Sequence, residues 1–287
     1  MQFKTDLYDY QRAGYEKLRK LKVGALYMEM GTGKTRTALE IIQRRLEKKR
    51  IKQVLWLCPC SVKVNLTSDL DKHADGWAGV IKVSGIESLS SSARLYAEHL
   101  QYVSQASTML IVDESDLVKN SRAIRSQRIT SIAEQCPYRL ILNGTPVSRN
   151  EADLYGQWYL LDWRILGYQS FWAFAANHLE YDSRYKHKVR QVLNIDYLTE
   201  KIAPYSYIVR KDDVLALPQK EFSWSNFYLT QEQSQHYDKV RDDFLEELIN
   251  AESRNGDIPD IHGVAGGVQW AAHRVPRVGK HKARTVF

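Results

Sequence analysis

The sequence predicts an α/β fold in which a mostly parallel sheet carries helices on both faces. Short apolar segments alternate with segments of helical periodicity along most of the chain, and this alternation is typical of parallel sheets. Residues 108–112 form a continuous apolar run, as expected for a central strand that is buried on both faces. A glycine-rich turn at residues 31–33 stands between an expected strand and an expected helix.

Local signals place the individual elements. Residues 7–21 have apolar side chains at helical spacing. The helix expected at 34–46 gathers Arg and Lys toward its end, where the helix dipole favours cations. Ser61 can cap the helix that follows it, and the pair Asn143-Gly144 ends a strand. In chain order, strands are expected at 24–28, 53–57, 80–83, 108–112, 139–142 and 205–210, and further helices at 93–103 and 122–134.

The chain is expected to divide into a large first domain and a shorter remainder. Residues 1–220 form the first domain, with an aromatic-rich helical insertion at about 151–204. Residues 221–253 begin a second domain, with a strand and then a helix that Thr230 can cap. Residues 254–287 contain Gly, Pro and basic residues without periodicity, which predicts a disordered tail.

Composition narrows the possible environments of the protein. No apolar run reaches the about 18 residues of a membrane span, and the first residues lack the features of a signal peptide. We therefore expect a cytoplasmic protein without membrane contacts. The net charge of +7 favours a nucleic-acid partner only weakly, because residues 268–287 alone hold five Arg or Lys and no acid.

Residues 27–35, Tyr-Met-Glu-Met-Gly-Thr-Gly-Lys-Thr, have the composition of a phosphate-binding loop, although Met28 stands where the general pattern has glycine. Two glycines let the backbone curl so that its N–H groups point at phosphate oxygens, and the following helix adds its positive end. Lys34 can reach the β- and γ-phosphates of ATP, and Thr35 can offer its hydroxyl to Mg²⁺. The ATP-binding residues expected here are Met30, Gly31, Thr32, Gly33, Lys34, Thr35 and Arg36.

Asp113 and Glu114 end the most apolar strand, where two carboxylates are costly to desolvate unless they meet a cation. Asp113 is expected to orient Mg²⁺ through its water, and Glu114 to accept the proton of the attacking water. Ligands of parallel sheets lie beyond the carboxyl ends of the strands, so the loop and the acidic pair can meet there. We expect the acidic pair to lie at the strand tip next to the loop, with Lys34, Asp113 and Glu114 as catalytic residues. The alternatives are a plain glycine-rich turn and an ordinary strand end with two exposed acids.

Gln11 lies 20 residues before Gly31. A glutamine amide offers both a donor and an acceptor, the combination that the edge of adenine requires. Its position predicts a contact with the base of ATP, and a surface glutamine is the alternative.

These residues together resemble the Swi/Snf-type DNA translocases of helicase superfamily two, in a phage- or bacterial-like form, and the resemblance runs from about Leu7 to Tyr237. The acidic segment Asp113-Glu-Ser-Asp116 is similar to the family's Asp-Glu-Ala-His box, with Asp116 in place of the usual His. The closing segment at 208–220 resembles the end of the first motor lobe and is the most specific match. The other matching segments are 7–11 (Q motif), 28–35 (motif I), 57–65 (motif Ia), 119–121 and 140–146 (motif III).

The resemblance implies an ATP- and Mg²⁺-dependent ATPase that has two RecA-like lobes and tracks along double-stranded DNA through contacts to its backbone. It gives Asp116, Gly144 and Thr145 a role in coupling hydrolysis to movement. DNA contacts are expected at turns where small and hydroxyl residues let a phosphodiester approach backbone N–H groups, and plain helix-capping turns are the alternative. The expected DNA-binding residues are Pro59, Cys60, Ser61, Lys63, Ser84, Gly85, Lys119 and Asn120.

The second lobe is expected to begin near Phe222, yet nothing after Tyr237 resembles motifs V and VI, whose arginines should stabilise charge on the γ-phosphate. We therefore expect a truncated motor from a bacterial or phage-infected cell, completed by a missing lobe or a protein partner. A lone lobe that binds ATP or DNA with little turnover is the alternative. A small-molecule kinase is less favoured, because segments 113–116 and 208–220 have no role in one.

Overall fold

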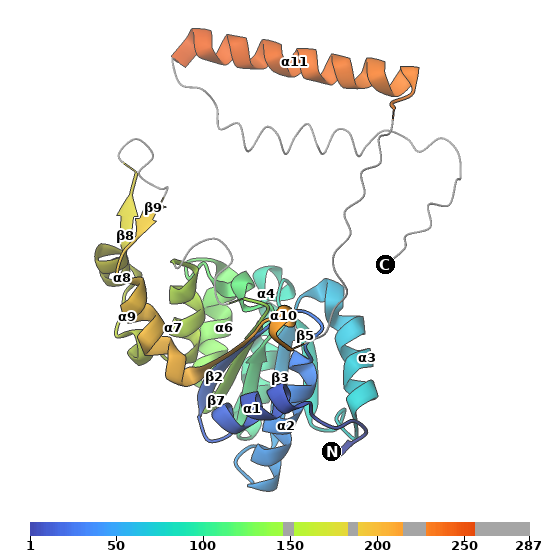
Figure 1. The fold of residues 1–287 in the computed structure, drawn as a ribbon, viewed down its shortest axis with the longest axis vertical. Coiled ribbons are helices and arrows are strands. Elements are labelled where there is room, and N and C mark those ends of the chain that lie inside the picture. Colours follow the sequence, from blue (N-terminus) through green and yellow to red (C-terminus); the bar gives the residue numbers. More distant parts are fainter. Residues whose placement is uncertain (146–151, 183–188, 215–227, 256–287) are drawn as a thin grey trace. The chain divides into compact units, whose positions relative to one another are not determined.

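The computed structural model describes residues 1–145, 152–182, 189–214 and 228–255 (Figure 1). Contacts between residues divide the chain into two units, Met1–Leu217 and Pro218–Phe287. The first unit is built on a six-stranded sheet whose neighbouring strands all pair in parallel, which confirms the predicted α/β fold. Residues 221–227, where the second domain was expected to begin with a strand, and most of the expected tail, residues 256–287, lie outside the described residues.

The order of the strands decides which chemical groups meet at the edge of the sheet. The strand before the glycine-rich loop and the strand before Asp113 are separated by a single strand, the one that ends at Asn143. Across the sheet the order is β10 (Ser206–Val209), β2 (Val23–Met28), β7 (Tyr138–Asn143), β6 (Thr108–Val112), β3 (Gln53–Cys58) and β5 (Ile81–Gly85).

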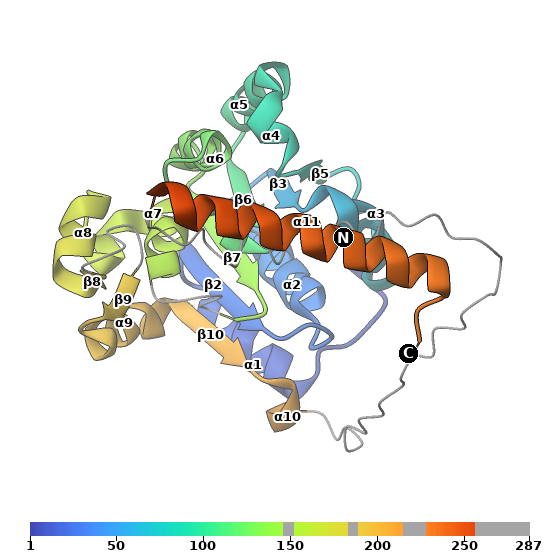
Figure 2. The ribbon, with the colours of Figure 1, turned by 90° about the horizontal axis from the view of Figure 1, so that it is seen from above.

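Two apolar layers cover the two faces of this sheet, because successive side chains of a strand point to opposite faces. On β3, Leu55 and Leu57 belong to one layer, whereas Val54 and Trp56 belong to the other. Figure 2 shows α6 and α7 on one side of the sheet and α1 and α2 on the other. The Trp56 layer includes residues of α1 (Asp9–Leu18), α2 (Lys34–Glu47) and α3 (Lys63–His73), and the Leu55 layer residues of α4 (Ser88–Ser91), α5 (Ala93–Gln105), α6 (Ile124–Glu134) and α7 (Ala152–Leu166).

The turn after β3 differs from the prediction. A short 3₁₀ turn, η1 (Cys60–Val62), follows the strand, and α3 begins only at Lys63. Val62 occupies the N-cap position of α3 without a side-chain cap, so the prediction that Ser61 caps this helix is wrong. The short strand β1 (Gln2–Phe3) pairs antiparallel with β4 (Ala74–Asp75). The 3₁₀ turn η2 (Ser115–Val118) follows β6.

A helical insertion was expected between α7 and β10, but this segment also contains two strands. It holds α8 (Phe171–His178), the antiparallel pair β8 (Leu179–Tyr181) and β9 (Val189–Val192), and α9 (Ile195–Ile202). The ring of His178 is buried, and its Nε2 lies 3.0 Å from the hydroxyl of Tyr168. Through η3 (Ala203–Tyr205) the chain returns to the sheet as β10, which pairs with β2, and continues as α10 (Lys211–Val214).

The second unit contains α11 (Gln231–Asn255). Its start is a capping box, in which Gln233 N donates to Thr230 Oγ1 at 3.3 Å and Thr230 N donates to Gln233 Oε1 at 3.1 Å. The predicted cap at Thr230 is therefore confirmed. Within the described ranges, no helix has both the length and the apolar character needed to cross a membrane.

Candidate functional site

The turn between β2 and α2 has the backbone geometry of a phosphate-binding loop. Gly31 and Gly33 adopt φ angles of 86° and 85°, a left-handed conformation that other residues rarely take. A Cβ atom on Gly33 would lie only 2.1 Å from Nε2 of Gln11, so this position also lacks room for a side chain. The first N–H groups of α2 have no partners within their helix, which leaves them free for an anion at this turn.

Side chains of the loop hold this turn in shape. Thr32 is fully buried, and its Oγ1 and N both donate to the carbonyl of Glu29, at 2.7 Å and 3.1 Å. The ammonium of Lys34 donates to the carbonyl of Met28 at 3.0 Å, so it lies beside the loop that it follows. Thr35 is half-buried in the first turn of α2, and Met30 is largely exposed. Of the loop residues named from the sequence, all but Arg36 therefore lie at the turn itself.

The side chain of Gln11, in α1, contacts the loop and supports it. Its Nε2 donates to the carbonyl of Thr32 at 3.0 Å, and its Oε1 accepts from the N–H of Tyr8 at 3.1 Å. Its side chain is buried, with 4% of its surface exposed. Both functions of the amide are thus engaged by backbone in this structure, whereas the sequence had suggested that they face a base.

Arg36 points away from the turn. Its Nε donates to the carbonyl of Thr5 at 3.0 Å, its Nη1 pairs with Glu40 at 2.8 Å, and its guanidinium lies 3.9 Å from the centre of the Phe3 ring. These contacts line a hollow of about 330 Å³ next to the residues that precede Gln11. Arg36 therefore lines this hollow and not the turn, and its expected contact with ATP stays a prediction. The hollow is lined by Phe3, Lys4, Thr5, Asp6, Leu7, Arg12, Arg36 and Glu40.

Asp113 follows β6 at the same edge of the sheet as the loop. Val112 pairs with Ile141 of β7, and Tyr27 pairs with Asn143 of the same strand. The strands before the loop and before Asp113 therefore end on either side of β7, and the expectation that they are direct neighbours is corrected. The pKa of Asp113 is raised to about 6 by burial and by the charge of Glu114, while the nearby ammonium of Lys34 opposes the rise. Lys34 and Asp113 thus lie close enough to interact.

The backbone turns sharply at the acidic pair. Glu114 has a φ of 48°, in the left-handed region, and its N–H donates to Oδ1 of Asp113 at 3.0 Å. The next residue is fixed from α7, because the buried Ser115 Oγ donates to Gln157 Oε1 at 2.6 Å. A non-glycine residue in this conformation is strained by roughly 1–3 kcal/mol, and such strain persists where surrounding contacts enforce it.

The three residues expected to couple hydrolysis to movement lie after two of these strands. Gly144 and Thr145 follow β7, and the Gly144 N–H donates to Asn143 Oδ1 at 2.7 Å. Asp116 is half-buried in η2, two residues after Glu114. All three lie near the edge that holds Lys34 and Asp113, which is what a role between the nucleotide and another ligand requires.

The expected DNA-binding residues fall into exposed and buried groups. Cys60, Ser61 and Lys63 are exposed after β3, whereas Pro59 is buried. Ser84 is also buried, and its Oγ lies 2.8 Å from Nε2 of the buried His99.

Gly85 is covered as well, because a Cβ on it would lie 2.3 Å from the Cys60 sulfur. The expected contact loop at Ser84 and Gly85 is therefore corrected, since the side chain and the space it would use are occupied inside the fold. The exposed Cys60 uses its own N–H to donate to Oε2 of Glu87 at 2.8 Å.

Of the two remaining expected DNA contacts, one is mostly buried and the other is exposed. The ammonium of Lys119 pairs with Asp153 at 3.1 Å, and both side chains are mostly buried. Asn120 is exposed, and its Oδ1 accepts from the N–H of Arg122 at 3.0 Å. The geometry thus leaves Cys60, Ser61, Lys63 and Asn120 at the surface.

Sequence reasoning missed two residues at the loop. Glu29 Oε2 accepts from the backbone N–H of Lys211 at 2.7 Å, although 182 residues separate the two. The side chain of Lys211 also reaches the loop, because a Cβ on Gly31 would lie 3.7 Å from Lys211 Nζ. The only sequence signal was that Lys211 belongs to the closing segment at 208–220, which resembled the end of a motor lobe.

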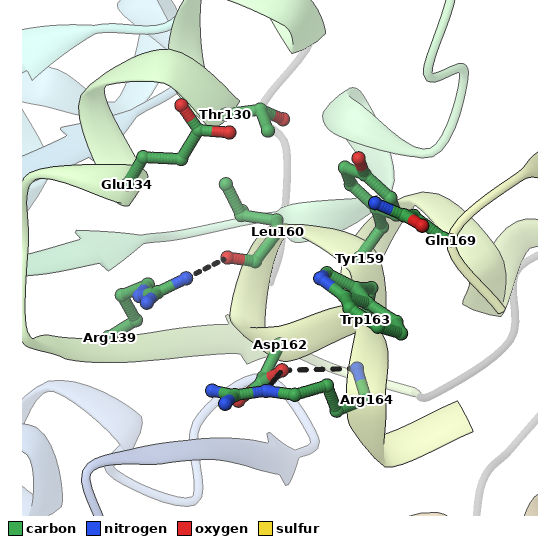
Figure 3. A pocket seen from close by; sticks show the side chains of 9 residues that line it. All are labelled: Thr130, Glu134, Arg139, Tyr159, Leu160, Asp162, Trp163, Arg164 and Gln169. Carbon is green, nitrogen blue, oxygen red and sulfur yellow. Dashed lines mark hydrogen bonds and ion pairs between the residues drawn. The ribbon is translucent and has the colours of Figure 1, made fainter. Parts of the chain in front are cut away.

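A second hollow lies between α6 and α7, at the end of the sheet where β7 begins (Figure 3). Its volume is about 350 Å³. Its two arginines already have partners, since Arg139 donates to the carbonyl of Leu160 at 3.2 Å and Arg164 binds Asp162 at 2.6 Å. This hollow lies at the end of the sheet opposite to the phosphate loop, and it shares no residue with that loop.

Comparison with known families gives two matches along the chain. The model of the SNF2-related domain matches residues 79–257, and that of the type III restriction enzyme res subunit matches residues 4–70. The first match includes the acidic pair and the closing segment, and the second includes the phosphate loop.

Curated relatives are more distant and much longer. An uncharacterized ATP-dependent helicase, MG018, of Mycoplasma genitalium is 24% identical over 271 residues, covering 88% of this chain and 25% of the relative. A homolog of SWI/SNF-related matrix-associated actin-dependent regulator of chromatin subfamily A-like protein 1 from Caenorhabditis elegans is 24% identical over 85% of this chain and 37% of the relative. The chain therefore spans well under half the length of these relatives.

A solved structure shares the fold. The Sulfolobus solfataricus SWI2/SNF2 ATPase core in complex with dsDNA superposes with a TM-score of 0.57 and 21% sequence identity, over 95% of this chain and 57% of that one. At this identity the likeness shows the fold alone, and it confirms the RecA-like architecture expected from the sequence.

Proposed function

The chain belongs to the SNF2-related domain family, and we propose that it is the nucleotide-hydrolysing part of an ATP-dependent motor that moves on double-stranded DNA. One observation carries this proposal. The loop that ends in Lys34 and the carboxylate of Asp113 lie at one edge of the sheet, close enough for Lys34 to lower the Asp113 pKa. A cation next to a buried carboxylate at a phosphate-binding turn is the arrangement that Mg–ATP requires.

The proposed nucleotide site uses the groups at this edge. The N–H groups of the turn and of the first turn of α2 hold the phosphates, and Lys34 neutralises the β- and γ-phosphates. Thr35 and Asp113 would hold Mg²⁺, which supplies charge neutralisation when bound. Glu114 is the candidate base, because its strained backbone and the bond from Ser115 to α7 fix it beside Asp113. The glycine geometry supports this fit, since a side chain at Gly33 would be strained at its φ of 85° and would meet Nε2 of Gln11.

For the base of the nucleotide we propose the hollow beside Gln11. It is lined by the Phe3 ring, by Arg36 and by the residues that lead into α1. Gln11 then links the two parts of the site, because its side chain contacts the carbonyl of Thr32 in the loop.

We propose the exposed residues Cys60, Ser61, Lys63 and Asn120 as the DNA contacts. Lys63 offers a charge at the start of α3, and Ser61 offers a hydroxyl in the preceding turn. Contacts of this kind position a phosphodiester backbone without reading its sequence. The proposed domains are a first lobe at 1–220, the beginning of a second lobe at 221–253 and a basic tail at 254–287.

A second function remains under consideration, in which the chain binds ATP or DNA with little turnover. One assay separates the two functions. ATP hydrolysis is measured with and without double-stranded DNA, for the full chain and for Lys34→Ala. Turnover that DNA stimulates and that Lys34→Ala abolishes supports the motor, whereas intact ATP binding without turnover supports the binding module.

A further inference from the structure

Two hydrogen bonds join residues 209–211 to the start of the phosphate loop, one between backbone groups and one from a backbone N–H to a side chain. The N–H of Glu29 donates to the carbonyl of Val209, the last residue of β10, at 3.1 Å. The side chain of Glu29 turns to the same segment, and its Oε2 accepts from the N–H of Lys211 at 2.7 Å. Glu29 is only two residues before Gly31, so this hydrogen bond places Lys211 next to the loop.

The side chain of Lys211 lies along the loop. A Cβ built on Gly31 would lie 3.5 Å from Lys211 Cε and 3.7 Å from Nζ, so the ammonium borders the Gly31 backbone. Lys211 is half-buried, at the start of the short helix α10. In the part of the chain that the structure describes, it makes no ion pair with a carboxylate.

Two ammonium groups therefore border one glycine-rich turn, since Lys34 approaches it from the start of α2 and Lys211 from the start of α10, just after β10. Like charges at one turn repel, and a bound polyanion would convert that repulsion into attraction. The carboxylate of Glu29 binds the backbone N–H of Lys211, and among the described residues no ion pair joins it to the Lys211 ammonium.

We propose that Lys211 is a second phosphate-binding lysine, whose ammonium contacts the phosphate oxygens of the nucleotide held at the Gly31–Lys34 turn. This inference rests on the proposed nucleotide-binding function of that turn. Glu29 acts as a positioning residue, since its bond to the Lys211 N–H fixes where the lysine stem begins. The nucleotide would then contact α10, which follows β10, as well as the loop.

A binding experiment on the full chain tests this role. The affinities of ATP, ADP and adenosine are measured by isothermal titration or by competition with a fluorescent ATP analogue, for the wild type, Lys211→Met, Lys211→Arg and Lys34→Ala. Methionine keeps the length of the stem and the backbone bond to Glu29 but removes the charge. Lys22→Met is the matched control, because Lys22 is exposed and lies before β2, at the other end of the strand.

Lys211→Met should bind ATP and ADP about 10-fold more weakly, as expected for one partly exposed charge-assisted hydrogen bond, and should bind adenosine as the wild type does. Lys211→Arg should restore most of the loss, and Lys22→Met should lose nothing. Unchanged ATP affinity in Lys211→Met, or an equal loss for adenosine, would overturn the role of Lys211 while the effect of Lys34→Ala leaves the nucleotide site standing. A wild type that binds no ATP would overturn both. Thermal unfolding of each variant separates a folding defect from a lost contact.

Discussion

The side chain of Gln11 donates a hydrogen bond of 3.0 Å to the carbonyl of Thr32, and its nitrogen fills the space in which a side chain at Gly33 would stand. The first helix of the chain and the glycine-rich turn are thereby fixed as one piece. A residue expected to contact a base thus also determines the shape of the loop that holds phosphates, and variants at Gln11 should affect both.

Replacing Gln11 by Ala should weaken ATP binding about 10-fold, because the Thr32 carbonyl and the Tyr8 N–H lose their buried partners and the loop loses its support. Titration with ATP and with inorganic pyrophosphate measures the effect. If Gln11 supports the loop, both ligands lose affinity. A loss for ATP alone would show that it contacts only the base.

Protonation of Asp113 should make stability depend on pH. Its pKa in the folded protein is about 6, above the ordinary value of 3.8, so the folded state holds the proton more tightly than the unfolded state. The free energy of unfolding should therefore fall by roughly 2 kcal/mol as pH rises from about 4 to 6 on account of this group, an order-of-magnitude figure from the shift. Asp113→Asn should lack this decrease in denaturant titrations. Parallel pH profiles of the two proteins would contradict the raised pKa.

Glu87 should oppose DNA binding at the turn after β3. Its carboxylate accepts from the Cys60 N–H that the sequence assigned to a phosphodiester. Burial raises the pKa of Glu87, but the hydrogen bonds from Cys60 and from its own backbone, together with the charge of Arg125, lower the pKa below its ordinary value. Glu87→Ala frees the N–H and removes a negative charge, so a short duplex should bind roughly threefold more tightly at low salt. Fluorescence anisotropy measures the change, with Glu47→Ala, at the end of α2, as the control that should leave affinity unaltered.

Gly156 should be essential to the support of the acidic pair. A Cβ on Gly156 would lie 2.4 Å from the carbonyl of Lys119, so Gly156→Ala must push α7 away from η2 and strain the bond between Ser115 and Gln157. We expect a loss of roughly 1–3 kcal/mol in unfolding free energy. Gly79→Ala is the control, because nothing lies within 4 Å of a Cβ at that position. Equal stability of the two variants would show that α7 can move without cost.

The fold was predictable because its signals are local. The strand at Thr108–Val112 has the bounds that its apolar run indicated, and α2 begins at the Lys34 that follows the glycine turn, as expected. The order of the strands was not predictable in this way, because pairing depends on the whole sheet. That is why β7 lies unexpectedly between the strands of the loop and of Asp113.

The places of Lys34 and Asp113 were predictable because local signals fix them, a glycine turn before the helix and the end of an apolar strand. The partners of other polar side chains were less predictable. A serine suits a surface turn and a buried bond equally well, and Ser84 takes the second option because His99 lies 2.8 Å away inside the fold. Lys119 meets Asp153, and Glu29 meets Lys211 across 182 residues. Such partners come together only in the folded chain.

The binding of ATP with and without Mg²⁺, measured by titration for the wild type, Lys34→Ala and Asp113→Asn above pH 7, tests most directly whether the loop and the acidic pair serve one nucleotide. The wild type should bind ATP more tightly when Mg²⁺ is present than in EDTA. Asp113→Asn should lose that gain while keeping the metal-free affinity, and Lys34→Ala should bind weakly in both conditions. A gain from Mg²⁺ that is the same in Asp113→Asn and in the wild type would contradict a shared site.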